Sequence, residues 1–192
     1  MAIPKSPWYS RQTLWSLFLM CAFPLHIWTI VLAFRDVSWV AERSNMWDAI
    51  GVVSYGLIFA FVESLIIFLI AVLLGFLVSR HWDADRRVFL LSILVLIDAL
   101  WSMFSQYYFL GGLSLPAGLN RYLVQTGHPV RILYTVIVPL VSLSALIPAY
   151  LILKSEKVFQ FFQGLVERVT LLTLFYLFFD VIGLVIVIIR NI

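Results

Sequence analysis

Three acidic side chains, Glu63, Asp98 and Asp180, each lie near the middle of a separate long apolar segment. A charged carboxylate at the centre of a bilayer costs about 2.5–3.5 kcal/mol on insertion scales, so acids at this depth usually mark a ligand site or an ion path. No lysine or arginine lies at the same depth to neutralise them. The residues therefore predict an acidic site within a membrane that binds a proton, a cation or a cationic solute.

The composition indicates the class of protein. Hydrophobic residues make up 63% of the 192 residues and charged residues 12%, and the mean hydropathy is +1.03. A globular domain in water does not have these values. The net charge is +3, but the basic residues lie at the ends of the apolar segments rather than in a stripe that would bind nucleic acid. We therefore expect a multi-pass membrane protein whose first partner is the lipid bilayer, and no nucleic-acid partner.

Five apolar runs reach the length of about 20 residues that a helix needs to cross a hydrocarbon core of about 30 Å. They predict an all-α bundle of five transmembrane helices, which forms a single transmembrane domain over residues 1–192. The expected helices cover residues 12–34, 50–78, 88–109, 132–153 and 169–189. The longest loop, 110–131, contains Gly and Pro and is expected to re-enter the membrane or to cap the bundle. Residues 158–166 are expected to form a short interfacial helix or a loop.

The basic residues also indicate the orientation of the chain. Lys and Arg are more frequent in the N-terminal segment and in the second and fourth loops than in the connections on the other side. Loops rich in Lys and Arg stay in the cytoplasm. We therefore expect a cytoplasmic N-terminus, a C-terminus on the outside, and a location in the plasma membrane or inner membrane.

Every segment carries a stripe of small or polar residues. In a helix, residues three, four and seven positions apart share a face. This spacing joins Asp98 to Ser102 in the third segment, and Tyr176 to Asp180 in the fifth. We therefore expect the stripes to face one common centre. The expected ligand-binding site consists of Glu63, Asp98, Asp180, His26, Ser102, Ser142 and Tyr176, with Trp28 and Trp101 as an aromatic wall.

Each of these residues also has a purely structural interpretation. A carboxyl group removed from water holds its proton more tightly and can donate a hydrogen bond to a neighbouring helix. His26 is similarly interpreted as a satisfied core histidine, and Trp28 and Trp101 as packing residues. Three acids at one depth with no basic partner favour a shared ligand site over three separate structural hydrogen bonds.

Three classes of function fit these residues. The first, which we expect, is a membrane carrier or permeation protein. The second is an integral-membrane protein or enzyme that binds a lipid, sterol or isoprenoid with the same acids. The third is a scaffold or accessory subunit, for which a partner subunit or a second copy of the chain supplies the missing basic residue. Signatures for nucleotide use, serine hydrolysis and zinc proteolysis are missing from the sequence, so no catalytic residue, cofactor or metal site is assigned.

A resemblance to a known group supports the second class. Through His26 and Glu63 on the first two segments, and Pro139 and Pro148 on the fourth, the first four segments resemble the EXPERA sterol-isomerase and sigma-2-receptor group. The resemblance implies a membrane bundle that handles a sterol or related lipid. No role of an individual residue follows from it.

Overall fold

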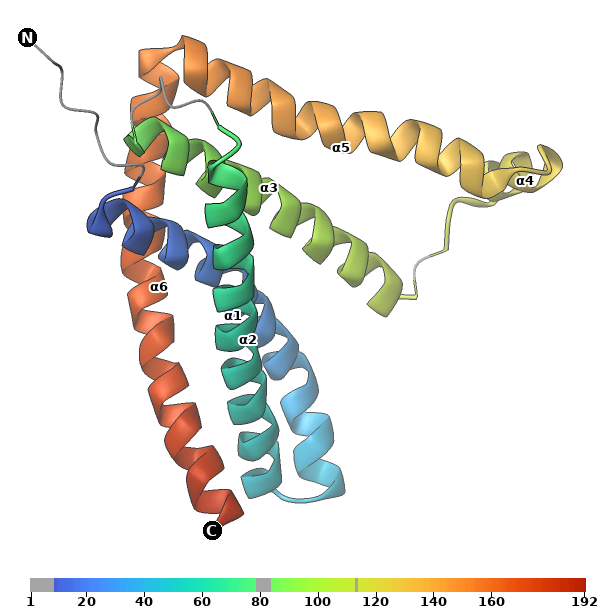
Figure 1. Cartoon of the computed structure of the whole chain (residues 1–192). Helices are drawn as coiled ribbons and strands as arrows, with labels where there is room; N and C mark the ends of the chain where they lie inside the picture. The colour runs from blue at the N-terminus through green and yellow to red at the C-terminus, as the bar shows by residue number, and fades with distance from the viewer. Residues whose placement is uncertain (1–8, 79–83, 113) are drawn as a thin grey trace, which may run out of the picture.

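The computed structural model describes residues 9–78, 84–112 and 114–192 (Figure 1). These residues form six α-helices and no strand. The helices are α1 (Arg11–Arg43), α2 (Met46–Gly75), α3 (Ala84–Leu110), α4 (Ala117–Gln125), α5 (Pro129–Lys154) and α6 (Glu156–Asn191). All except α4 are long and apolar enough to cross a membrane. The prediction of an all-α protein with five transmembrane helices is confirmed, whereas the side that each terminus faces stays a prediction.

Several helix boundaries differ from those expected. The loop 110–131 contains α4, and residues 158–166 belong to α6 instead of forming a loop or a separate helix. Ser155 alone connects α5 to α6 as the C-cap of one and the N-cap of the other. The early start of α6 has a packing reason, because Phe159 and Phe162 form edge contacts with Phe89 of α3, at 5.1 and 6.4 Å between ring centroids.

Helix α2 lies between α6 and the second half of α1, and the first half of α1 crosses α6 (Figure 1). Helix α1 changes direction on its way through the molecule (Figure 1). It contains Pro24, which removes one backbone hydrogen bond and is a common cause of such a bend. The first half of α1 packs against α3, and the second half follows α2 towards the turn that joins them. These three helices provide the framework for the polar residues of the interior.

Helix α5 is the least covered of the long helices. It extends with α4 away from the α1–α2–α6 bundle (Figure 1), and Ile152 near its end is its one buried residue. There Ile152 joins a core cluster with Met20, Phe89, Ile93 and Val166. The α5 arm is therefore anchored to the bundle through the end that leads into α6 and through its contacts with α3.

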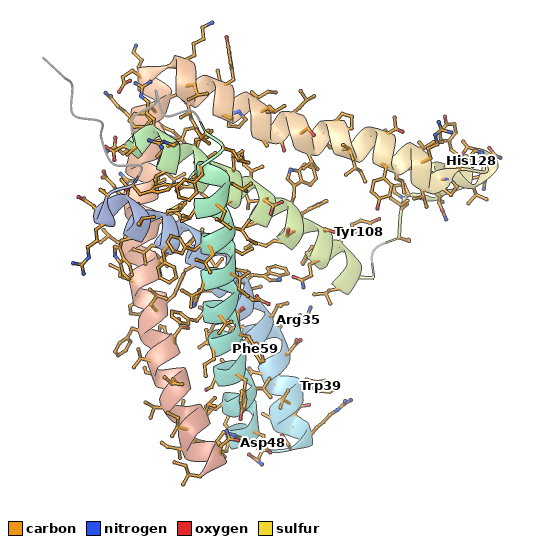
Figure 2. The ribbon with its side chains drawn as sticks, in the orientation of Figure 1. Arg35, Trp39, Asp48, Phe59, Tyr108 and His128 are labelled. Atoms are coloured by element: carbon orange, nitrogen blue, oxygen red, sulfur yellow. The ribbon has the colours of Figure 1, made fainter. Side chains whose placement is uncertain are left out.

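The opposite end of the bundle is closed by polar contacts between α2 and α6. Arg190 donates to a carboxylate oxygen of Asp48 at 2.7 Å and to the backbone carbonyl of Trp47. The amide of Asn191 donates to the hydroxyl of Tyr55 at 2.6 Å. Figure 2 shows Asp48 at the end of α2 where α6 terminates. These contacts fix the register of α6 against α2, and hence the depth at which Asp180 faces its neighbours.

Candidate functional site

A buried histidine and a buried aspartate join α1 to α6. His26 is fully buried and Asp180 is 8% exposed. The Nε2 atom of His26 lies 2.8 Å from Oδ2 of Asp180, and its Nδ1 atom lies 2.8 Å from the backbone carbonyl oxygen of Ala22. Because residues 22 and 26 are one helical turn apart, the helix itself supplies the second partner of the imidazole ring.

The stripe on α6 faces inward as the helical spacing predicts. Thr173, Asp180 and Gly183 are the buried residues in this part of the helix. A Cβ atom at Gly183 would lie 3.4 Å from the backbone oxygen of Ser54, which leaves room for alanine but not for a large side chain against α2. In the His26–Asp180 pair, the second carboxylate oxygen of Asp180, Oδ1, is buried and has no hydrogen-bond partner in the structure. A buried carboxylate oxygen without a donor is rare and calls for a functional or chemical explanation.

Glu63 and Asp98 line a separate cavity of about 330 Å³ between α1, α2 and α3. Both side chains are exposed rather than buried in protein. Ser102, Trp28 and Gln106 add polar or aromatic groups to the wall. The rest of the wall is largely apolar, and within residues 9–78, 84–112 and 114–192 no lysine or arginine contributes to it. Its other members are Cys21, Pro24, Leu25, Thr29, Leu32, Ile67, Val95, Ala99 and Met103.

Gln106 is a site residue that the sequence reasoning missed. Its side-chain oxygen accepts a hydrogen bond from the indole N–H of Trp28, which connects α3 to α1 across the cavity. The signal was present in the sequence, because Gln106 follows Asp98 by eight residues and Ser102 by four, and therefore extends the same stripe.

A second cavity of about 310 Å³ adjoins the first. It lies between α1 and α2, and the two cavities share Thr29, Leu32 and Glu63. Asp36, one turn further along α1 than Leu32, also lines the second cavity. Polar groups therefore follow α1 from Asp36, through Glu63, to Asp98.

The expected single centre is divided between two places in the structure. Asp180 and Tyr176 do not line the cavity that contains Glu63 and Asp98. On α1, His26 precedes Trp28 by two residues, which places their side chains about 200° apart around the helix axis. Thus α1 carries His26 towards α6 on one face and Trp28 towards the cavity on the other. The expected site is divided in two because α1 lies between Asp180 on one side and Glu63 with Asp98 on the other.

The remaining residues of the expected site lie elsewhere. The indole of Trp101 donates to the hydroxyl of Ser144 at 2.8 Å, which joins α3 to α5. Ser142 is exposed on α5. The ring of Tyr176 stacks on Phe23 with a centroid separation of 6.3 Å. In the described part of the chain, no group of three or more His, Cys, Asp and Glu residues is arranged to hold a metal ion.

Comparisons of the chain with protein-family models, curated proteins and solved structures find no match. The resemblance of the first four segments to the EXPERA group therefore rests on the residues quoted for it.

Proposed function

We propose that this chain is a membrane carrier or permeation protein that binds a cation or a cationic solute in the cavity between α1, α2 and α3. The observation that supports this proposal most directly is that Glu63 and Asp98, from two different helices, line one cavity in which no basic side chain is found among the described lining residues. Two carboxylates in a cavity within the membrane raise the free energy of the protein while the cavity is empty, and a bound cation offsets that cost. A neutral or anionic ligand would leave it in place.

The cavity also favours a particular size and kind of cation. Its volume of about 330 Å³ lies at the lower end of the range of about 300–1,000 Å³ for small-molecule sites. A small organic ammonium group fits this space better than a whole lipid does. Trp28 contributes an aromatic face, which attracts cations by about 0.5–2 kcal/mol depending on how far they are desolvated. Its hydrogen bond to Gln106 holds the indole ring in place before the ligand arrives.

A route to the cavity supports movement rather than storage. The adjoining cavity reaches Asp36 and shares Glu63 with the first. Glu63 belongs to the walls of both cavities, so a cation that enters beside Asp36, which forms an ion pair with Arg35 at 2.7 Å, would reach Glu63 and Asp98 along α1. Carboxylates along such a route lower the cost of moving a cation through the membrane interior.

Transport in proteoliposomes tests the proposal. The purified protein is reconstituted, and uptake of tetraethylammonium, methylammonium and sodium is compared with uptake by protein-free liposomes. We expect the wild type to take up at least one of these cations, and Glu63→Gln and Asp98→Asn to reduce that uptake at least tenfold. Glu42→Gln is the matched control, because it removes an exposed carboxylate of α1 outside both cavities. Wild-type liposomes as impermeable as empty ones to all three cations would refute the proposal.

A second candidate function is that of a subunit in a larger membrane assembly. Polar side chains of α3 and α5 that a lipid chain cannot hydrogen-bond, including Ser105 and Ser142, are exposed. A partner helix against these faces would satisfy them. If this candidate is correct, extraction in a mild detergent yields a complex larger than one 22.1 kDa chain, as measured by light scattering. A stable monomer with unchanged cation uptake would count against it.

A further inference from the structure

The hydrogen bonds of His26 fix where its protons are. The carbonyl oxygen of Ala22 can only accept, so the Nδ1 atom 2.8 Å away must carry a hydrogen. The other ring nitrogen, Nε2, lies 2.8 Å from Oδ2 of Asp180. That separation is a hydrogen bond only if one proton lies between the two atoms.

This proton count gives the pair no net charge. If the shared proton is on Nε2, a positive imidazolium faces a carboxylate. If it is on Oδ2, a neutral imidazole accepts from a neutral carboxylic acid. Both arrangements carry one shared proton and a total charge of zero, which explains how His26 and Asp180 are buried together without a lysine or arginine.

Other charge states do not fit the observed contact. Removal of the shared proton leaves a lone pair of Nε2 facing a carboxylate oxygen and a net negative charge in the interior. Addition of a second proton leaves a net positive charge. In either case a buried, unpaired charge costs free energy, and the contact between α1 and α6 is weakened. The proton and the helix contact are therefore linked.

The neighbouring titratable groups do not supply a compensating charge. Tyr176 on α6 is stacked on Phe23. On α2, Asp48 and Tyr55 are bound by Arg190 and Asn191 at the end of α6, and Glu63 lines the cavity on the other face of α1. Asp98 of α3 lines that same cavity, Cys21 is a buried thiol of α1, and Arg35 and Asp36 pair with each other. On α6, Glu167 accepts from Gln163 and, like Arg168, is exposed.

We propose that His26 and Asp180 form a proton-exchange site that holds one shared proton while α1 packs against α6 and weakens that contact when the proton leaves. The unpartnered Oδ1 of Asp180 is the acceptor that meets the first water molecule once the helices separate. Since α1 also presents Trp28 to the cavity, its movement away from α6 changes the cation site. Only this last link, from proton to cation, rests on the proposed function.

Histidine NMR tests the proton site directly. The chain has three histidines, so the variant His81→Gln/His128→Gln leaves His26 as the single labelled side chain. His128 lies at the tip of the α4–α5 arm, far from α1 (Figure 2). With ¹⁵N-labelled histidine in lipid nanodiscs, we expect Nδ1 to be protonated at neutral pH, and Nε2 to exchange its proton in one step as the pH is varied.

The dependence on Asp180 completes this test. Asp180→Asn should abolish that titration or shift its midpoint by at least one pH unit, whereas the control Asp85→Asn, at the start of α3, should leave it unchanged. If Asp180→Asn fails to fold, Asp180→Glu keeps a carboxyl group and must also move the midpoint. An unprotonated Nδ1, a ring that does not titrate, or a titration indifferent to residue 180 would overturn the proposal.

Transport separates this inference from the proposed function. In proteoliposomes, we expect the ratio of cation uptake with and without a pH gradient to differ from one in the wild type and in Asp85→Asn, and to return to one in Asp180→Asn. A ratio that Asp180→Asn does not alter would refute the coupling while leaving the cation site standing. If no cation is taken up at all, the proposed function fails, and the NMR titration still decides whether the pair exchanges a proton.

Discussion

Replacement of Gly75 by alanine should destabilise the protein, mainly by displacing the side chain of Tyr9. A Cβ atom at position 75 would overlap the hydroxyl oxygen of Tyr9 and lie 2.9 Å from Cδ1 of Leu91, so the phenol ring must leave its place and the end of the leucine side chain must shift slightly. In the structure that hydroxyl donates to the backbone carbonyl of Val72 at 3.1 Å, and the ring packs edge-on against Phe76 with centroids 5.8 Å apart. Burial raises the pKa of the Tyr9 phenol, with the positive charge of Arg87 opposing part of the rise. The hydroxyl therefore keeps its proton at neutral pH and remains a donor.

The expected cost follows from these two contacts. Loss of a typical hydrogen bond costs about 0.5–1.5 kcal/mol, and loss of an edge-to-face aromatic pair costs about 0.5–1.5 kcal/mol. The better helix propensity of alanine returns up to about 1 kcal/mol in a helix interior, and less here because Gly75 is the last residue of α2. We expect Gly75→Ala to lower the free energy of unfolding by about 1–2 kcal/mol.

A double-mutant cycle in detergent micelles measures this cost. Unfolding is followed by circular dichroism as the fraction of a denaturing detergent is increased, for Gly75→Ala, Tyr9→Ala, Tyr9→Phe and the combination of Gly75→Ala with Tyr9→Ala. Tyr9→Phe removes the hydrogen bond and keeps the ring, so it reports the first contribution alone. In the Tyr9→Ala background, Gly75→Ala should cost less than half as much as in the wild type. An equal cost in both backgrounds would show that Tyr9 does not occupy this position.

Three further substitutions probe the contacts between helices. Arg190→Gln should lower the melting temperature only slightly, because the ion pair with Asp48 is partly exposed and water screens it. A large decrease in the melting temperature would contradict this. Ser144→Ala removes the acceptor of the Trp101 indole, and should cost about 1 kcal/mol and raise hydrogen exchange in α5 but not in α2. Gly183→Leu forces side-chain atoms against the α2 backbone and should cost about 1–3 kcal/mol, whereas Gly183→Ala should unfold nearly as the wild type does.

The sequence predicts the number of membrane-spanning helices because membrane insertion depends on local apolar length, but it does not predict the short helix α4. It misplaces the start of α6, where Gln160, Gln163, Glu167 and Arg168 interrupt the apolar run although the backbone stays helical. Hydropathy identifies the segment that prefers lipid. Helix α6 extends beyond that segment, so hydropathy alone places its start too late.

The candidate site is predicted in part for a related reason. Helical spacing identifies the inward face of α6, including Asp180, because that face depends on one helix alone. It does not reveal that His26 pairs with Asp180 while Glu63 and Asp98 share a different cavity. Which acid meets which partner depends on how α1 is rotated about its axis between its neighbours. That rotation is determined by packing among several helices and not by the spacing of residues within one helix.

The length of α6 limits how the molecule is positioned in a bilayer. Its 36 residues extend for about 54 Å, whereas the hydrocarbon layer is about 30 Å thick. Tilt takes up a fraction of that difference, and the polar first turns then lie among the lipid headgroups, where Glu156 is tied to Arg86 of α3. Because Ser155 is the whole connection between α5 and α6, a movement of α5 is transmitted directly to the first turns of α6. An antibody fragment raised against these turns would add rigid mass to a small protein and make particle alignment in electron microscopy feasible.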